Sequence, residues 1–403
     1  MTFRTLDQAQ LAAKRALVRV DFNVPVKDGE VADDVRLRCA LPTINALRRA
    51  GAKTILISHF GRPKGKRVAS MSLRPVVAPL AKLLGAPVAF AEDCVGPTAK
   101  AAVDAMKPGE VLLLENLRFH PGEEANDPNF ARALAANGDL YIDDAFSAAH
   151  RAHASSVGVA RLLPAFAGED MRRELQALRA ALDHPVHPVL GIVGGSKVST
   201  KLDMLFNLIL KLDRLAIGGG MANTFLFSQG WPVGASICEK DLAEAARDIM
   251  AFAEKHNCEL LLPVDVVVAE RAAPGAMARV CALGRLDDVE RILDAGPKTL
   301  QRLIAAIDEA KTLIWNGPLG VFEVPPFDKA TVAAARHAAE RVMAGRLVAV
   351  AGGGDTDAAL RSAGVAGDFT FVSTTGVAFL QWMEGKTLPG VAALDNQLER
   401  EGR

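Results

Sequence analysis

The 403-residue chain has few aromatic residues, few cysteines and no excess of charge of either sign. Aromatic side chains make up only 5% of it, so we expect its cores to be built from Ala, Val and Leu. Lys and Arg together number 47, and so do Asp and Glu, which argues against nucleic-acid or membrane-surface binding because both usually need a basic excess. The five cysteines show no CxxC spacing, which favours reduced thiols in a cytoplasmic protein.

Several signature motifs are also missing. Residues 1–14 lack the apolar stretch of a signal peptide, and no apolar run approaches the ~18 residues that span a membrane. The chain contains neither a strict P-loop nor a clean GxGxxG, and it has no Cys/His spacing typical of a metal site and no GxSxG elbow. Metallohydrolase and serine-hydrolase chemistry are therefore disfavoured.

What the chain does contain is short apolar runs that alternate with helical patterns. Near-continuous apolar strands between helices predict parallel sheets covered on both faces. These runs are too many for one compact unit, so we expect an α/β fold of two doubly wound, Rossmann-like domains. The expected strands are Leu17–Phe22, Thr54–Ser58, Val111–Glu115, Leu140–Asp143, Val189–Val193, Leu215–Ile217, Leu260–Val268, Thr312–Trp315, Leu347–Ala351 and Phe369–Val372. The expected helices include Val35–Ala50, Leu73–Leu84, Thr299–Ala310 and Thr331–Ala344.

The boundary between the two domains is expected near residues 165–185. A helical pattern over Met171–Arg179 is followed there by His184-Pro185-Val186-His187-Pro188, and proline disfavours helix in the residue before it. We therefore predict an N-terminal domain over 1–167, a semi-rigid helical connector over 168–188 and a C-terminal domain over 189–387.

Polar and basic side chains follow the expected strands of the first half. Ligands of open parallel sheets bind beyond the carboxyl ends of the strands, so these side chains should converge on one pocket. Guanidinium groups match phosphate and carboxylate oxygens, which predicts a small, multiply anionic ligand. The residues concerned are Asp21, Asn23, Arg36, His59, Arg62, Arg118, His150 and Arg151.

Glycine turns follow the expected strands of the second half. The strand Val189–Val193 runs into Gly194-Gly195-Ser196-Lys197, where we expect a helix to open with Lys197 and Lys201 on one face. Glycine lets the backbone approach an anion closely, and the first amides of a helix point at it. This arrangement predicts a phosphate site.

Two further glycine turns strengthen this prediction. They are Gly218-Gly219-Gly220 and Gly352-Gly353-Gly354-Asp355-Thr356, and Asn316 stands at another strand end. Together they indicate a nucleotide site in which Asp355 is a candidate ligand for Mg²⁺, since hard cations prefer carboxylate and phosphate oxygens. Any one glycine pair is more often only a tight turn, and a lone arginine at a strand end is usually a solvated surface group. Their coincidence in both halves favours function.

Motifs in both halves together resemble the phosphoglycerate kinase family over essentially the full chain. The segments that carry the resemblance are Arg19–Pro25, Ser58–Pro63, Glu115–Phe119, Ala149–His153, Gly194–Val198, Trp315–Glu323 and Gly352–Thr356. The resemblance implies reversible, Mg²⁺-dependent phosphoryl transfer between ATP and the carboxylate of 3-phosphoglycerate. It also implies a monomeric, cytoplasmic enzyme of glycolysis with small-molecule substrates only, whose domains close about a hinge.

The resemblance further implies roles for individual residues. It implies that 3-phosphoglycerate contacts Asp21, Asn23, Arg36, His59, Arg62, Arg118 and Arg151. The nucleotide would contact Gly195, Lys201, Gly219, Asn316, Glu323, Gly353, Gly354, Asp355 and Thr356, with Asp355 also on Mg²⁺. Arg36, Lys197 and the amides at Gly376 would meet the transferring phosphoryl group. The tail, residues 388–403, would pack back on the N-terminal domain.

One segment departs from the family pattern. Where the family carries Ser-Thr-Gly-Gly-Gly-Ala, this chain reads Ser373-Thr374-Thr375-Gly376-Val377-Ala378. β-branched residues resist a positive φ, so the turn would work only if Gly376 alone needs unusual angles. Two alternatives therefore stay open: another carboxylate kinase, and a non-catalytic nucleotide-binding relative.

Overall fold

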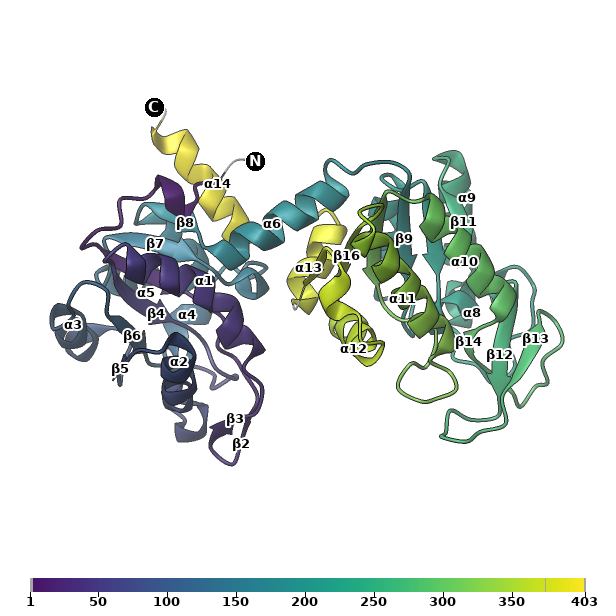
Figure 1. The fold of residues 1–403 in the computed structure, drawn as a ribbon, viewed down its shortest axis with the longest axis horizontal. Helices are drawn as coiled ribbons and strands as arrows, with labels where there is room; N and C mark the ends of the chain where they lie inside the picture. The colour runs from purple at the N-terminus through teal and green to yellow at the C-terminus, as the bar shows by residue number, and fades with distance from the viewer. Residues whose placement is uncertain (1–2, 374, 402–403) are drawn as a thin grey trace. The chain divides into compact units, whose positions relative to one another are not determined.

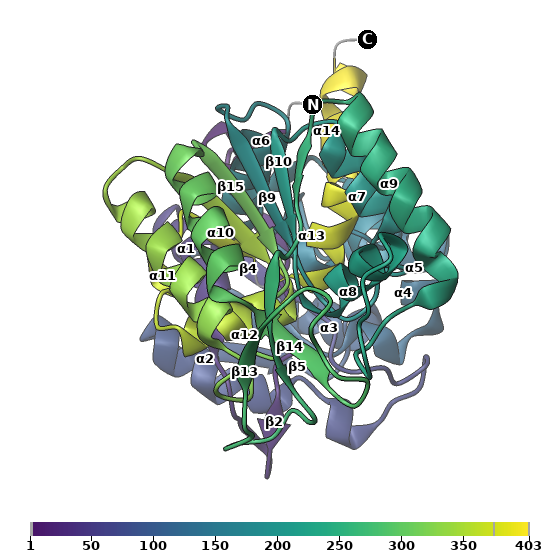
Figure 2. The ribbon, with the colours of Figure 1, turned by 90° about the vertical axis from the view of Figure 1, so that its right-hand side faces the viewer.

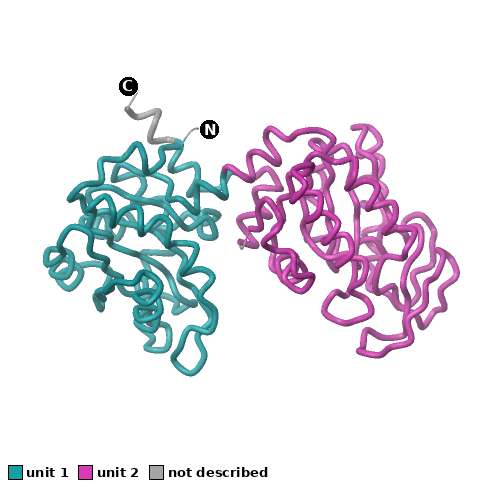
Figure 3. The backbone as a smooth tube through the Cα atoms, in the orientation of Figure 1, with its two compact units in different colours: residues 1–175, 387–403 teal, residues 176–386 magenta. Residues whose placement is uncertain are grey.

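The chain forms two compact units in a computed structural model that describes residues 3–373 and 375–401 (Figure 3). Unit 1 comprises Met1–Leu175 and Thr387–Arg403, and unit 2 comprises Gln176–Lys386. The division falls inside the helix α6 (Glu169–Leu182), so this helix contributes residues to both units.

Unit 1 is built on a six-stranded parallel sheet in the order β5-β6-β4-β1-β7-β8. The strands are β1 (Arg15–Arg19), β4 (Lys53–Ile57), β5 (Val88–Ala91), β6 (Val111–Leu114), β7 (Leu140–Asp143) and β8 (Ala165–Ala167). Its α-helices are α1 (Val35–Arg49), α2 (Val77–Leu84), α3 (Gly96–Asp104), α4 (Pro121–Glu124), α5 (Pro128–Ala135) and α14 (Pro389–Glu401), with a hairpin of β2 (Val26–Lys27) and β3 (Glu30–Val31). Short helical turns are η1 (Leu6–Gln8), η2 (Ala69–Met71), η3 (Arg74–Val76), η4 (Leu117–Phe119), η5 (Phe146–Ala148), η6 (Ala154–Gly158) and η7 (Val159–Arg161).

Helices cover this sheet because its strands are apolar on both faces (Figure 1). Leu37, Ile44 and Leu47 of α1 are fully buried in the same core as Val18 of β1 and Leu56 of β4. Removing such side chains from water stabilises a fold by roughly 1.5–3 kcal/mol each. The sheet is therefore a rigid base for the loops that follow its strands.

Unit 2 is built on a second six-stranded parallel sheet in the order β11-β10-β9-β15-β16-β17. The strands are β9 (Val189–Val193), β10 (Arg214–Ile217), β11 (Glu259–Leu261), β15 (Thr312–Asn316), β16 (Val348–Gly352) and β17 (Phe371–Ser373). A smaller antiparallel sheet consists of β12 (Asp265–Ala269), β13 (Arg279–Ala282) and β14 (Arg291–Ala295). The helices are α7 (Leu202–Ile209), α8 (Gly219–Ser228), α9 (Ala243–Lys255), α10 (Pro297–Glu309), α11 (Lys329–Met343), α12 (Gly354–Ser362) and α13 (Gly376–Met383), with the turns η8 (Lys240–Leu242) and η9 (Ala366–Asp368).

Figure 2 shows α10 and α11 on one face of the unit 2 sheet and α7 and α9 on the other. The buried face of α11 is built from small residues, among them Ala334, Ala335 and Ala338, which are fully buried. Alanine cores of this kind follow from the scarcity of aromatic residues. The prediction of two doubly wound parallel-sheet domains is confirmed.

Two local predictions are wrong. Leu260–Val268 is not one strand, because β11 ends at Leu261 in the parallel sheet and β12 begins at Asp265 in the antiparallel one. Pro263 lies between them and has no N–H to donate to a sheet. The short strands β2, β3, β5, β8, β13 and β14 were not predicted.

The second wrong prediction is the helix expected to open at Lys197. The helix α7 begins only at Leu202, so Lys197 and Lys201 do not share a helix face. Ser199 donates from its backbone N and its Oγ to the Glu239 carboxylate, at 3.0 and 2.6 Å, and this holds the preceding residues in a loop.

The helix α14 packs on unit 1 near η6, η7 and β8. Its Gly390 donates a backbone hydrogen bond to the carbonyl of Ala149 at 2.9 Å, and Val391 and Leu394 are buried. A Cβ on Gly390 would lie 2.9 Å from the Cα of Ala149, so this close approach needs glycine. Residues 402–403 of the expected tail lie outside the described residues. Among the residues that are described, no helix has the length and apolar character needed to cross a membrane.

Candidate functional site

The first candidate site lies at the carboxyl edge of the unit 1 sheet. β1 pairs with β4 and β7 in parallel, with Arg19 opposite both Ile57 and Asp143, so these strands end at the same edge. The loops after β1, β4, β6 and β7 and the first turn of α1 therefore meet there. They carry the predicted residues Asp21, Asn23, Arg36, His59, Arg62, Arg118, His150 and Arg151.

Asp21 is a central acceptor in this group. Arg36 Nη1 and Ser147 Oγ both donate to its Oδ2, and the backbone N of Asn23 donates to its Oδ1 at 3.0 Å. Burial alone would raise the pKa of Asp21, but the positive charge of Arg36 and the hydrogen bonds from Ser147 and the backbone of Asn23 outweigh it and lower the pKa. Asp21 is therefore ionised at neutral pH and orients Arg36.

Asn23 and Arg118 are joined through Gly61. The backbone N of Gly61 donates to Asn23 Oδ1 at 2.9 Å, and Arg118 Nη1 donates to the Gly61 carbonyl at 2.7 Å. Arg118 also forms an ion pair with Glu124. Burial, with the nearby charge of Arg151, lowers the pKa of Arg118 to about 10, which leaves it charged at neutral pH.

The remaining basic residues differ in exposure. Arg62 is exposed, whereas Arg151 is half-buried and donates from Nε to His150 Nε2 at 2.9 Å. Burial and the charge of Arg151 lower the pKa of His150. The cluster thus holds several permanent cations and neutral imidazole, which suits an anionic ligand.

Arg19 was not predicted as a site residue. It is fully buried, and its Nη2 lies 3.0 Å from Nδ1 of His59. Its position as the last residue of a buried strand was the available sequence signal, because a buried arginine requires partners.

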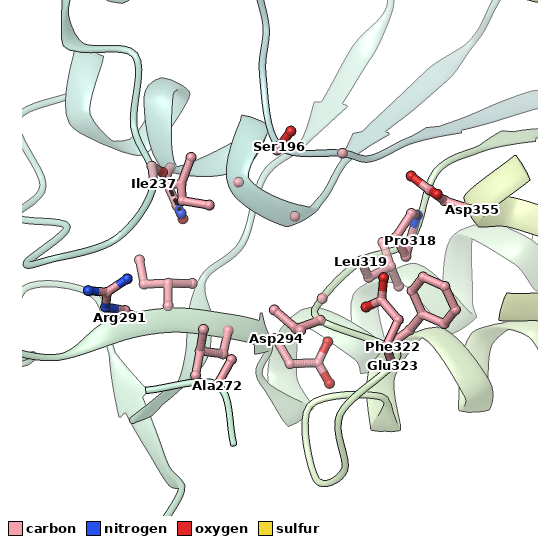
Figure 4. A pocket seen from close by; sticks show the side chains of 18 residues that line it. Ser196, Ile237, Ala272, Arg291, Asp294, Pro318, Leu319, Phe322, Glu323 and Asp355 are labelled. Atoms are coloured by element: carbon pink, nitrogen blue, oxygen red, sulfur yellow. Dashed lines mark hydrogen bonds between the residues drawn. The ribbon is translucent and has the colours of Figure 1, made fainter. Parts of the chain in front are cut away.

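The second candidate site is a cavity of about 410 Å³ in unit 2, within the usual size range of small-molecule pockets. Gly195, Ser196, Gly219 and Gly220 line one wall, and residues 318–323 line another. Figure 4 shows Asp355 and Arg291 toward opposite ends of this cavity. Its apolar lining includes Ile237, Leu293, Leu319, Val321 and Phe322.

Glycines in and beside this cavity allow backbone-to-backbone contact between strand ends. A Cβ on Gly194 would lie 1.9 Å from the carbonyl oxygen of Pro318. Gly219 has φ +64°, and a Cβ there would lie 2.8 Å from the carbonyl oxygen of Gly195. The turns after β9, β10 and β15 therefore converge, and they leave room for a ligand to contact main-chain atoms.

Lys201 lies in a network of oxygen acceptors rather than on a helix face. Its Nζ donates to the carbonyls of Gly194 at 2.6 Å and Asn316 at 3.2 Å, and also to Asn316 Oδ1. Burial lowers the pKa of Lys201 to about 8, against the opposing charge of Asp355. Lys197 is exposed in the preceding loop.

Asn316 and Thr356 tie the ends of β15 and β16 together. Asn316 Nδ2 donates to the Gly352 carbonyl at 2.7 Å, and Thr356 Oγ1 accepts from the backbone N of Gly317 at 2.7 Å. Of the predicted nucleotide contacts, the cavity is lined by Gly195, Gly219, Glu323 and Asp355. Those absent from its lining are Lys201, Asn316, Gly353, Gly354 and Thr356, which belong to the adjoining network or to the start of α12.

Asp355 lies in the first turn of α12 and lines the cavity with an exposed carboxylate (Figure 4). A carboxylate oxygen beside anion-binding turns is the kind of donor that Mg²⁺ prefers. The residues present therefore fit a magnesium ion accompanying a phosphate ligand.

The turn that departs from the family pattern has ordinary backbone angles. Thr375 has φ −107° and ψ 102°, Gly376 opens α13 outside the left-handed region, and Val377 is exposed. Thr374 lies outside the described residues. Because neither Thr375 nor Gly376 has a positive φ, the β-branched side chain of Thr375 causes no strain there.

Folding also brings together three side chains whose sequence spacing resembles no metal motif. Donor atoms of Asp93, Cys94 and His120 lie within 4.8 Å of one another. His120 Nε2 and Asp93 Oδ1 are hydrogen-bonded at 2.7 Å, and burial raises the pKa of the Cys94 thiol well above its usual value. The group is thus a protonated thiol beside a polar pair.

The comparisons with known proteins agree with one another. Residues 6–386 match the family model described as phosphoglycerate kinase. The chain is 67% identical to a phosphoglycerate kinase of Caulobacter vibrioides (98% of this chain, 100% of the relative) and 59% identical to one of Azorhizobium caulinodans (98% and 99%). Its structure resembles the phosphoglycerate kinase of Coxiella burnetii with a TM-score of 0.92, at 39% identity over 98% of this chain and 100% of that one. The chain therefore belongs to the phosphoglycerate kinase family.

Proposed function

We propose that the chain transfers a phosphoryl group reversibly between ATP and the carboxylate of 3-phosphoglycerate, giving ADP and 1,3-bisphosphoglycerate. One observation supports this most strongly: a cation-rich cluster of side chains lies at the carboxyl edge of the unit 1 sheet, and a glycine-lined cavity with an apolar wall lies in unit 2. The first suits a small polyanion and the second a nucleotide, so two substrates have separate sites.

In this proposal, 3-phosphoglycerate binds in unit 1. Asp21 orients Arg36, Asn23 and Arg118 are linked through Gly61, and the exposed Arg62 is accessible to a ligand. Fixed guanidinium groups bind carboxylate and phosphate oxygens with two hydrogen bonds each. The full proposed contact set is Asp21, Asn23, Arg36, His59, Arg62, Arg118 and Arg151.

The nucleotide is proposed to bind in the unit 2 cavity. Backbone amides of Gly195 and Gly219, which line the cavity, and of the adjoining turn Gly353–Thr356 would approach its phosphates, and Glu323, also in the lining, would contact the ribose. The apolar lining, including Leu293 and Leu319, accepts the flat base. Asp355 holds Mg²⁺, which neutralises phosphate charge when bound, while Lys201 and Asn316 support the phosphate end of the site.

No general base is needed for this reaction. The attacking carboxylate is already ionised at neutral pH, and its oxygen forms a bond to the γ-phosphorus as the bond to the β-phosphate oxygen breaks and ADP leaves with the electron pair. The protein's own task is to align the two anions and to neutralise the equatorial oxygens. Arg36, Lys197 and the Gly376 amide are the proposed groups for this.

Because the two proposed sites belong to different units, the substrates must be brought together while water is excluded. We propose closure about the connector 168–188, with 1–167 and 189–387 as the moving domains and the tail 388–403 carried by the first. The enzyme is proposed to act as a cytoplasmic monomer. Small-angle scattering that shows no compaction with both substrates present would argue against closure.

A coupled assay tests the function directly. The protein is mixed with MgATP, 3-phosphoglycerate, glyceraldehyde-3-phosphate dehydrogenase and NADH, and loss of NADH is followed. We expect loss that requires every component and that disappears in Lys197→Ala. Folded protein that binds ATP but gives no NADH loss would contradict the proposal.

Two variants test the assignment of roles. An arginine directed at a transferring phosphoryl group contributes about 10³–10⁵ in rate in comparable enzymes, so Arg36→Ala should lower kcat far more than His59→Ala. Arg38→Ala is the matched control, since Arg38 lies on the same helix but is exposed and paired with Asp34. Equal losses for Arg36→Ala and His59→Ala would refute the roles given to them.

A further inference from the structure

We infer that Arg19 is a positioning residue that fixes His59 as the tautomer with its proton on Nε2, so that this nitrogen of the imidazole is an N–H donor and not an acceptor. The use of that donor by 3-phosphoglycerate rests on the proposed function. The tautomer itself follows from contacts within unit 1.

The two side chains meet at the end of neighbouring strands. Arg19 is the last residue of β1, and His59 follows β4 by two residues. Arg19 is 1% exposed and His59 is 8% exposed, and Arg19 Nη2 lies 3.0 Å from His59 Nδ1. Water therefore has little access to the contact, and the two groups must satisfy each other.

The direction of this hydrogen bond is set by chemistry. A guanidinium carries five N–H donors and no acceptor, and it stays protonated in proteins. Nδ1 of His59 must therefore accept, which leaves the ring proton on Nε2. A ring turned so that carbon faced Arg19 would leave a buried guanidinium N–H without its partner.

The guanidinium of Arg19 is itself fixed by a buried chain of hydrogen bonds. Its Nε donates to Ser155 Oγ at 2.9 Å, and Ser155 Oγ donates in turn to Glu123 Oε1 at 2.6 Å. Its Nη1 donates to the Val20 carbonyl. Glu123 is fully buried and accepts a second bond from the Ser155 backbone. Each of the three guanidinium nitrogens of Arg19 thus makes a hydrogen bond within unit 1, which holds the side chain against His59.

Burial keeps the His59 ring neutral. Burial lowers the pKa of His59 well below its usual value; the carboxylate of Asp21 opposes this, and the cations of Arg19, Arg118 and Arg151 lower the pKa further. A protonated ring would also place an N–H on Nδ1 against the N–H of Arg19. His59 therefore donates without changing charge near pH 6.5, where an ordinary histidine titrates.

Histidine-selective ¹⁵N labelling and two-bond ¹H–¹⁵N correlation NMR test this on the full-length, ligand-free protein. His59→Gln identifies the resonances of His59. In the wild type we expect an unprotonated Nδ1 and a protonated Nε2 that persist at pH 6. In Arg19→Met we expect a mixture of tautomers, a higher pKa for His59 and a KM for 3-phosphoglycerate raised about tenfold or more, the loss expected of one hydrogen bond to a charged group.

Two further variants separate positioning from a structural effect. Arg15→Met is the matched control, because Arg15 lies on the same strand but is paired with Asp139 at its other end, and it should leave His59 unchanged. Arg19→Lys keeps a buried donor and should restore the Nε2–H tautomer. An Arg19→Met protein that is less stable but keeps the wild-type tautomer would overturn the inference.

The wild-type spectrum decides the question even where Arg19→Met does not fold. A proton on Nδ1, or a His59 that titrates near pH 6.5, overturns the role of Arg19. The failure of the proposed function looks different: 3-phosphoglycerate would leave the resonances of His59 unmoved while the tautomer remained as inferred.

Discussion

The affinity for nucleotide should depend on pH through Lys201. Its Nζ is buried at the ends of β9 and β15 among the carbonyls of Gly194 and Asn316, and burial lowers its pKa to about 8. A bound polyphosphate adds negative charge beside this ammonium and so favours its protonated form. Above pH 8 most Lys201 side chains are neutral and must take up a proton when nucleotide binds. The free energy of this proton uptake weakens nucleotide binding above pH 8.

The size of the effect follows from the shifted pKa. With a pKa of about 8, roughly nine-tenths of Lys201 is charged at pH 7 and roughly one-tenth at pH 9. If the bound state requires the charged form, the Kd for ADP rises about tenfold between these pH values, which corresponds to about 1.4 kcal/mol. A lysine with its usual pKa near 10.4 would change the Kd by only a few per cent over the same range.

Isothermal titration calorimetry with ADP at constant free Mg²⁺, at pH 7, 8 and 9, measures this directly. Lys201→Arg is the control, because a guanidinium stays charged throughout and should give a flat profile even if its affinity is lower. A wild-type Kd that is constant to pH 9 would refute the reasoning, and so would an equal slope in Lys201→Arg.

Three substitutions should have predictable effects on stability. Burial and the charge of Asp170 raise the pKa of Asp144 to about 8, so the folded protein loses stability as pH rises from about 4 to 8, because ionisation of this carboxyl favours the unfolded chain. Asp144→Asn should therefore raise Tm at pH 8, with a smaller gain at pH 5. A gain in Tm that is equal at the two pH values would contradict this. Gly194→Ala should cost at least about 1–3 kcal/mol in urea unfolding, because its Cβ would lie 1.9 Å from the Pro318 carbonyl oxygen. Gly376→Ala should cost nothing or stabilise by up to about 1 kcal/mol, because nothing lies within 4 Å of its Cβ position; a loss like that of Gly194→Ala would show that the turn needs glycine.

The sheets could be predicted from sequence because buried parallel strands are almost continuously apolar. The expected strand Val189–Val193 coincides with β9, and Val111–Glu115 differs from β6 by one residue. The basic residues of unit 1 follow the carboxyl ends of such strands. Because parallel pairing brings these strand ends to one edge of the sheet, the sequence was enough to predict that the basic side chains lie together. The glycine turns of unit 2 were grouped by the same argument.

What could not be predicted depends on partners far away in the chain. Residues after Gly195 look helical locally, yet Glu239 holds Ser199 in a loop from 40 positions away. Arg19 reads as an ordinary strand residue until folding places His59 and Ser155 beside it. A local sequence pattern indicates which secondary structure a segment favours. The role of a buried charged side chain depends instead on the groups that form hydrogen bonds with it in the folded chain.

The two sites respond differently to substitution because they are built from different atoms. The unit 1 site is built from side chains that orient one another, as Asp21 orients Arg36. Replacing one of them therefore disturbs its neighbour. The unit 2 cavity relies on main-chain groups, whose donors survive any substitution that the local φ permits. Gly194 fails that condition because a carbonyl oxygen already occupies its Cβ position, whereas Thr375 meets it with φ −107°. A turn that lost a family glycine at Thr375 therefore keeps its amide, which is why we expect this departure to leave the proposed catalytic turn intact.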